Sequence, residues 1–301
     1  MHRPRIMHLP DLSLISTDRI PASFIKSELP VDVLRLDKVH DVISGNKWFK
    51  LHKYLEIAQA EKKSRIISFG GPWSNHIIAV AAAARIYGYA SMGFIRGEKN
   101  ETLTPILQQC QDWGMELCFL DRSEFDQEKF PERMIKEDDL LIPMGGYGIQ
   151  GMEGAGTILD HCRQQDYTHF CCATGTGTMM AGLLNKITAD QTVIGFSAVK
   201  NDPVLEDHIR KLLPDYRGPV LFETDKRFGG FARYNEELIN FMNELFEASS
   251  IPTDIVYTAK LCYAVIHKIR AGEFAAGSRV LIIHSGGLTG NYSVKNGLLI
   301  M

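Results

Sequence analysis

The sequence has no long run of basic residues and no apolar segment long enough to cross a membrane. Its 301 residues carry 33 Lys and Arg against 36 Asp and Glu, a formal net charge of -3 at pH 7. Nucleic-acid binding needs a basic surface, so we expect no nucleic-acid partner. A membrane span needs ~20 consecutive apolar residues, and the N-terminal 16 residues lack the apolar stretch of a signal peptide. We therefore expect a soluble, cytoplasmic protein without a membrane partner.

The sequence also lacks the cysteine patterns of a zinc site or a disulfide framework. Its six cysteines include no C-x-x-C pair and no closely spaced set of Cys and His. Cys118, Cys171 and Cys172 lie in apolar, strand-like runs, where a free thiol packs as a small hydrophobic side chain. We expect core-filling thiols in a reducing compartment and no bound metal.

What the sequence does contain is an alternation of short apolar runs with longer amphipathic segments. The first series starts near residue 65 with RIISF and continues through ASMGFI, MELCFL and LLIPM; the second runs from THFCCA through TVIGFSAV to RVLIIHS. Parallel strands need crossover connections, and helices commonly provide them. The pattern predicts an α/β fold with two open, twisted, mostly parallel sheets flanked by helices.

A glycine-rich stretch, IPMGGYGIQGMEGAG over residues 142–156, separates the two series. Such a glycine density is expected to break regular structure, so we place a crossing between domains near it. We predict a large cofactor-binding domain from residues 1–52 and 157–301 and a small α/β domain from residues 53–156. Further along, apolar periodicity predicts helices over residues 236–249 and 254–270.

The segment SGNKWFKL, residues 44–51, offers two amines near a turn. On a helical projection Lys50 lies at the edge of an apolar face, and Lys47 lies nearer to that face. Either amine could reach a cleft, although a single lysine is most often a solvated surface residue. Periodicity alone therefore leaves the choice between them open.

A glycine-threonine loop, TGTGT over residues 174–178, follows an apolar run and precedes a helix-like segment. Its glycines let backbone N–H groups converge on a phosphate at a helix start, although a tight strand-to-helix turn is the plain alternative. The loop lacks the lysine of a Walker A motif and fits G-x-G-x-x-G poorly. A lysine that can form a Schiff base, together with a phosphate cradle, indicates pyridoxal 5'-phosphate (PLP) as the cofactor.

Three further segments of the sequence contain candidate ligand-binding residues. In FGGPWSNH, residues 69–76, Ser74 or Asn75 should cap the following helix, and the same helix start attracts a carboxylate or phosphate. Ser285 ends the apolar run RVLII, and ligands in open α/β sheets bind outside the carboxyl ends of strands. Tyr257 lies early in an amphipathic segment, where a tyrosine usually belongs to the core.

Seven motifs occur in the order found in the 1-aminocyclopropane-1-carboxylate deaminase and D-cysteine desulfhydrase family of PLP enzymes, which the chain resembles from about residue 40 to about residue 290. They are SGNKWFKL, GGPWSNH, FIRGE, IPMGGYGIQG, ATGTGTMMAG, DIVYTAK and IHSGG. The resemblance implies the fold type II of the tryptophan synthase β-subunit, with PLP in the cleft between two lobes. Members of that family are commonly homodimers.

The resemblance also implies roles for individual residues. Lys50, the second lysine of N-K-x-x-K-L, would form the Schiff base and move the α-proton, while Ser74 would face the substrate carboxylate or act on it directly. Tyr257 would be a catalytic tyrosine. The cofactor would be held by Asn75 at its phenolic oxygen, by Gly175, Thr176, Gly177, Thr178 and Met179 at its phosphate, and by Ser285 near its pyridine nitrogen.

Three positions bear on the substrate through the same resemblance. Thr258 matches the desulfhydrases where the deaminases carry Glu, whereas Leu288 matches the deaminases, and Phe231 replaces the tyrosine of a usual G-Y-G stretch. We predict a PLP-dependent lyase or deaminase of a small amino acid, resembling D-cysteine desulfhydrase most. The alternatives are 1-aminocyclopropane-1-carboxylate deaminase activity, a non-catalytic PLP-binding protein, or a nucleotide-binding α/β protein.

Overall fold

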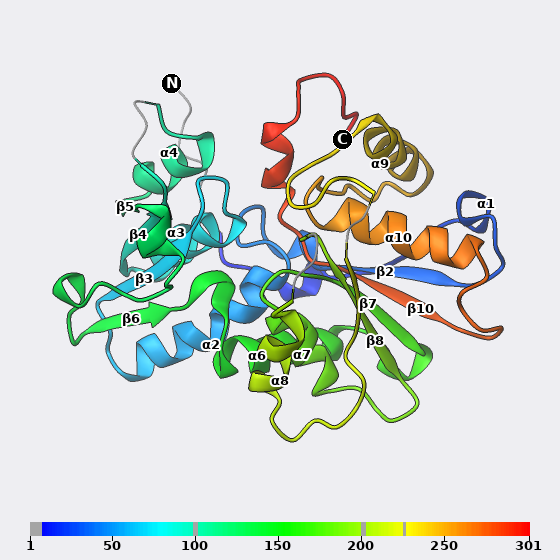
Figure 1. The fold of residues 1–301 in the computed structure, drawn as a ribbon, viewed down its shortest axis with the longest axis horizontal. Coiled ribbons are helices and arrows are strands. Elements are labelled where there is room, and N and C mark those ends of the chain that lie inside the picture. Colours follow the sequence, from blue (N-terminus) through cyan, green and yellow to red (C-terminus); the bar gives the residue numbers. More distant parts are fainter. Residues whose placement is uncertain (1–7, 99–101, 200–202, 225–226) are drawn as a thin grey trace.

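The computed structural model describes residues 8–98, 102–199, 203–224 and 227–301, and within them the chain forms two sheets. The larger sheet has the strand order β1-β2-β10-β7-β8-β9 and the smaller one the order β5-β4-β3-β6. Figure 1 shows the two sheets side by side, with helices packed around each. The predicted α/β fold class is confirmed.

Nearly all strand pairs in the described residues are parallel; β1 alone pairs antiparallel, with β2. The strands of the larger sheet are β1 (Thr17–Arg19), β2 (Val31–Arg35), β7 (His169–Thr174), β8 (Thr192–Ser197), β9 (Leu221–Thr224) and β10 (Val280–His284). Those of the smaller sheet are β3 (Arg65–Gly70), β4 (Ala90–Arg96), β5 (Met115–Leu120) and β6 (Asp139–Ile142).

The helices cover both faces of the sheets, as parallel strands require. They are α1 (Ala22–Ile25), α2 (Asn46–Ala60), α3 (Asn75–Tyr87), α4 (Pro105–Asp112), α5 (Arg122–Phe125), α6 (Ile149–Gly156), α7 (Thr178–Leu184), α8 (Leu205–Leu212), α9 (Glu236–Ser249) and α10 (Thr258–Arg270). Short 3₁₀ turns include Leu36–Val39, Met144–Gly146 and Leu288–Ser293. None of the helices in the described residues is long and apolar enough to cross a membrane.

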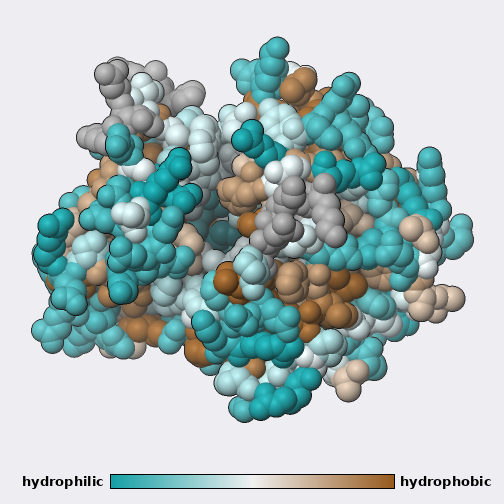
Figure 2. Space-filling model, in the orientation of Figure 1, coloured by the Kyte–Doolittle hydropathy of each residue, from teal (hydrophilic) through white to brown (hydrophobic). Residues whose placement is uncertain are grey.

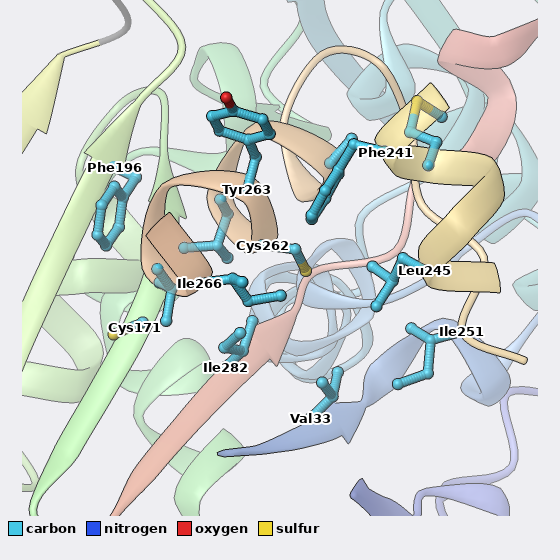
Figure 3. Packing of buried hydrophobic residues seen from close by; sticks show 14 of the residues in the cluster. Val33, Cys171, Phe196, Phe241, Leu245, Ile251, Cys262, Tyr263, Ile266 and Ile282 are labelled. Atoms are coloured by element: carbon cyan, nitrogen blue, oxygen red, sulfur yellow. The ribbon is translucent and has the colours of Figure 1, made fainter. Parts of the chain in front are cut away.

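The largest core lies between the larger sheet and helices α9 and α10. In Figure 3, Cys262 and Ile266 of α10 point toward Ile282 of β10, and Leu245 of α9 packs beside them. All six cysteines are free thiols, and burial raises the pKa of Cys262 to about 12, so this thiol stays neutral. It behaves as the small apolar side chain that the sequence predicts.

The glycine-rich stretch differs from the sequence prediction. It does not remain irregular, because residues 149–156 form helix α6. A Cβ atom at Gly151 would clash with the Gly146 carbonyl, and one at Gly154 would clash with the Phe49 carbonyl. These glycines therefore allow α6 to lie directly against its neighbours, which offsets their weak helix propensity.

Helix α9 spans the predicted residues, but α10 begins at Thr258 instead of Asp254. The cause is local, since the Asp254 carboxylate accepts hydrogen bonds from the backbone N–H groups that follow it. Helix α2 runs unbroken through residue 52, where we placed a domain boundary. The domain limits, the homodimer and the cytoplasmic location stay predictions, and residues 1–7 of the N-terminal segment lie outside the described part.

The loop after β10 meets the start of α2 at very short range. Asn46 donates its backbone N–H to the Ser285 carbonyl at 3.2 Å, and Gly45 donates to the Leu36 carbonyl at 3.0 Å. Gly45 has φ +61°, and a Cβ atom there would clash with the Ser285 carbonyl group. Only glycine combines this backbone conformation with this contact.

We predict that Gly45→Ala destabilises the protein more than Gly277→Ala does. Gly277 also has a positive φ, of +84°, but a Cβ atom there meets nothing within 4 Å, so it reports the backbone strain alone, about 1 to 2 kcal/mol. Thermal unfolding of the two variants beside the wild type measures the difference. Equal losses would show that the contact between Gly45 and Ser285 contributes nothing.

Candidate active site

The predicted site residues come from both sheets and follow the carboxyl ends of three strands. Ser74 follows β3, Gly175 follows β7 and Ser285 follows β10. This is the edge at which open α/β sheets bind ligands. Figure 2 shows that the surface is hollowed between the part of the molecule that carries the smaller sheet and the part that carries the larger one.

Two lysine amines lie one helical turn apart at the start of α2. The Lys50 side chain is buried, with 6% of the residue exposed, and its Nζ donates to the Gly145 carbonyl at 3.1 Å. Lys47 is half-buried, and its Nζ donates to Asn46 Oδ1 at 2.7 Å. The structure therefore brings both candidate amines inside, and neither is a solvated surface lysine.

Burial changes the charge state of these amines. Desolvation lowers the pKa of Lys50 well below its usual value, and the neighbouring Lys47 charge lowers it further. Desolvation also lowers the pKa of Lys47, to about 8, although the Asp254 carboxylate opposes the shift. A neutral amine is the nucleophilic form that attacks a carbonyl carbon, so Lys50 is ready for Schiff-base chemistry.

His76 is a buried neighbour of the lysines that the sequence analysis did not select. Ser68 donates its hydroxyl to the Ile142 carbonyl, so the 2.8 Å contact between Ser68 Oγ and His76 Nε2 is a donation from the ring. Desolvation, reinforced by Lys47 and Lys50, lowers the pKa of His76 well below its usual value. The ring is neutral, and its Nδ1 has no partner in the described residues. Its position directly after Ser74 and Asn75 in GGPWSNH is the feature of the sequence that could have identified His76 as a residue near the site.

The start of α3 holds two predicted residues. Ser74 is the N-cap, as expected, and its Oγ accepts from the backbone N–H groups of His76 and Ile77 at 3.2 Å each. Asn75 reaches across to the loop after β10: its Nδ2 donates to the Gly287 carbonyl at 3.1 Å, and its Oδ1 accepts from Thr289 Oγ1. Both atoms of the Asn75 amide are therefore oriented by that loop.

The glycine-threonine loop joins β7 to α7 in a form that suits a phosphate. Gly177 occupies the N-cap position with φ +80°, and no side chain of the described residues caps the helix. The hydroxyls of Thr176 and Thr178 lie 2.8 Å apart, while the buried Thr174 hydroxyl has no hydrogen-bond partner in the described residues. Uncapped N–H groups beside an unpartnered hydroxyl fit the phosphate of PLP.

This loop lies close to other predicted residues. A Cβ atom at Gly145, whose carbonyl accepts from Lys50, would stand 2.9 Å from Thr176 Cγ2, and one at Gly175 would stand 3.5 Å from the Tyr257 hydroxyl. Lys50, the loop and Tyr257 thus form one cluster. Met179 is buried in the first turn of α7, and Ser285 is buried after β10.

Tyr257 also lies against a separate cavity. Its ring packs edge-to-face with Phe231 at 5.8 Å, and desolvation raises the pKa of its hydroxyl, so the phenol stays protonated. The cavity, of about 220 Å³, lies at the ends of β8 and β9 and is lined by Tyr257, Ser197 and Thr224 among others. Lys50 is not among the residues that line it.

A family model described as "Pyridoxal-phosphate dependent enzyme" matches residues 16–286. The chain therefore belongs to the family of PLP-dependent enzymes. The predicted cofactor and the prediction of an enzyme are confirmed, and the nucleotide-binding alternative is wrong.

Two curated relatives indicate which PLP-dependent enzymes this chain resembles. A protein of Thermotoga maritima is 28% identical in an alignment that covers 96% of this chain and 99% of the relative. A protein of Pyrococcus horikoshii is 25% identical over 85% of this chain and 84% of the relative. Both carry the name "Putative 1-aminocyclopropane-1-carboxylate deaminase". The family resemblance predicted from the motifs is confirmed.

Solved structures share the fold. An "ACC deaminase homologue" superposes with a TM-score of 0.80 at 24% identity, covering 94% of this chain and 93% of that one. A fungal L-serine ammonia-lyase from Rhizomucor miehei has a TM-score of 0.66 at 14% identity, covering 91% and 93%. At these identities the likeness describes the arrangement of the chain and leaves the reaction open.

We predict that Thr289→Val weakens PLP binding by roughly 5- to 10-fold, because about 1 kcal/mol of hydrogen bonding no longer holds the Asn75 amide in place. Fluorescence titration of the apoenzyme with PLP measures the dissociation constant. Thr188→Val is the matched control, since within the described residues the exposed Thr188 hydroxyl bonds only to Asp190, in a distant turn. Identical affinities for the two variants would show that Thr289 does not orient Asn75 for the cofactor.

Proposed function

We propose that this enzyme removes ammonia from a small amino acid, as a PLP-dependent lyase or deaminase. The observation that carries the proposal is the pairing of a buried, neutral lysine with an uncapped glycine-threonine loop. When bound, PLP supplies an electron-withdrawing ring that stabilises negative charge at the α-carbon of the amino acid. The names of the relatives, deaminases and ammonia-lyases, support a reaction that releases ammonia.

In this proposal the Lys50 amine takes the α-proton and binds the cofactor, as the family resemblance implies. The pKa of Lys50, lowered well below its usual value by desolvation, supports Lys50 as the neutral nucleophile. Lys47, one helical turn away and with its pKa lowered to about 8, is the alternative amine. Both amines are buried enough to serve.

Ser74, Asn75 and Tyr257 complete the proposed site. The Ser74 Oγ accepts two backbone hydrogen bonds, so its own proton remains able to donate to a substrate carboxylate at the start of α3. The Asn75 amide would hold the phenolic oxygen of PLP, and the backbone of residues 175–179 its phosphate. The protonated Tyr257 phenol would donate a hydrogen bond or a proton to the substrate.

We propose D-cysteine or a close relative as the substrate. Elimination then breaks the bond between Cβ and sulfur; with one water, D-cysteine yields pyruvate, ammonia and hydrogen sulfide. Thr258 supports this choice through the family resemblance. The names of the relatives and Leu288 favour 1-aminocyclopropane-1-carboxylate. Phe231, which stands where the family usually has a tyrosine hydroxyl, keeps a different small amino acid as a further candidate.

We predict that borohydride reduction of the PLP-loaded enzyme labels a single lysine within residues 46–51. Peptide fragmentation by mass spectrometry identifies the residue, and Lys53, which pairs with Glu56 on the same helix, is the internal control. A label on Lys50 would confirm the assignment from the family resemblance. A label on Lys47 would give Lys47 the covalent role, and a label on neither would contradict the site.

We predict that the wild type, offered D-cysteine, L-cysteine, D-serine and 1-aminocyclopropane-1-carboxylate in turn, releases ammonia fastest from D-cysteine. Lys50→Ala should abolish turnover, whereas Ser74→Ala should lower kcat by roughly 100-fold or more while retaining PLP absorbance. Assays of ammonia and α-keto acid measure both. Fastest release from 1-aminocyclopropane-1-carboxylate would establish the alternative activity, and no release from any of the four compounds would contradict the proposed substrate class.

A further inference from the structure

A fully buried carboxylate, Asp254, organises the loop that carries Tyr257. Its Oδ1 accepts from the backbone N–H and the hydroxyl of Thr258, at 2.8 and 2.7 Å, and its Oδ2 accepts from the N–H groups of Val256 and Tyr257, at 2.9 and 3.1 Å. The backbone N–H of Asp254 in turn donates a hydrogen bond to Thr258 Oγ1 at 2.7 Å. Asp254 and Thr258 are both 0% exposed.

The Thr258 hydroxyl both donates and accepts a hydrogen bond within this pair of residues. A hydroxyl has one proton to donate, and that of Thr258 goes to Asp254 while its oxygen accepts from the Asp254 N–H. The side chain is enclosed, so it presents no polar group to a ligand. A direct contact between Thr258 and a substrate is therefore inconsistent with this geometry.

Burying a carboxylate is costly unless hydrogen bonds or a counter-ion compensate. No ion pair with Asp254 is found within the described residues, so the charge is stabilised by the N–H groups of its own loop and the Thr258 hydroxyl. Bonds to a charged acceptor are about twice as strong as neutral ones. The hydrogen bonds between Asp254 and residues 256–258 therefore hold residues 254–258 in one conformation.

The rest of the loop is fixed from the segment around β10. The Pro252 carbonyl contacts His284 Nε2 at 2.6 Å, and the Thr253 carbonyl accepts from Asn291 Nδ2 at 2.9 Å. Asn291 also accepts from the Ile255 N–H at 3.1 Å. Tyr257 is the last residue before helix α10, and its side chain extends from this fixed loop so that the hydroxyl lies near Gly175 of the phosphate loop.

We propose that Asp254 and Thr258 are positioning residues, which set the place of the Tyr257 hydroxyl relative to the glycine-threonine loop. Thr258 then affects the reaction through Tyr257 and not by touching the substrate. This inference rests on the proposed function, since it takes Tyr257 as part of the active site. The Asp254 charge also acts on Lys47, which couples the same residue to the second amine.

The test is a double-mutant cycle between Thr258→Val and Tyr257→Phe. Valine keeps the shape of threonine and removes the hydroxyl, whereas Thr258→Ser keeps the hydroxyl and is the matched control. Two readouts are taken for each PLP-loaded variant: kcat and KM with the best amino acid substrate, and the circular dichroism of the PLP absorption band. Thermal unfolding of each variant accompanies them.

We expect Thr258→Val to lower kcat by roughly 10-fold with little change in KM and to alter the PLP dichroism, while Thr258→Ser remains close to the wild type. In the Tyr257→Phe background Thr258→Val should change neither readout further. If Thr258→Val does not fold, Thr258→Ala decides by the same comparison.

Equal effects of Thr258→Val in both backgrounds would overturn the proposal, because Thr258 would then act independently of Tyr257. An increase in KM alone would overturn it in favour of a substrate contact. If the wild type turns over no amino acid, the proposed function fails. The dichroism comparison, which needs no turnover, then decides the positioning role by itself.

Discussion

The close approach of the Gly45 backbone to the Ser285 carbonyl is the constraint on which the site depends. It ties the start of α2, which carries both candidate lysines, to the end of the central strand β10. A second link joins Asn75, at the start of α3 beside the smaller sheet, to Gly287 and Thr289 in the loop after that strand. Residues from both sheets therefore keep a common geometry through the loop that follows β10.

Burial of charge-bearing groups in one region explains the chemistry. Desolvation favours the neutral forms of Lys50 and His76, and keeps the Tyr257 phenol protonated. The Asp254 carboxylate is buried as well, and the backbone N–H groups of its loop donate hydrogen bonds to it. The neutral Lys50 amine and the protonated Tyr257 phenol thus lie near a loop suited to an anion, an arrangement that fits the proposed PLP chemistry.

Particular elements show where sequence reasoning succeeded and where it failed. The apolar runs predicted the parallel strands, since strands buried on both faces must be continuously apolar. Glycine density misled over residues 149–156, because propensity does not register that Gly154 lets α6 touch α2. Periodicity extended α10 back to Asp254, since it does not detect a buried side chain that caps the helix later. His76 was missed because its significance lies in its neighbours.

The sequence by itself determined the fold class, the family and the cofactor, because these depend on local apolar pattern and on motifs that are continuous in the chain. Only the tertiary structure decided which side chains share an environment. It buried Lys50 and half-buried Lys47, brought Tyr257 next to Gly175, and enclosed the Thr258 hydroxyl against Asp254. Desolvation, hydrogen-bond partnership and the approach of distant backbones arise from long-range packing, which no short window of sequence contains.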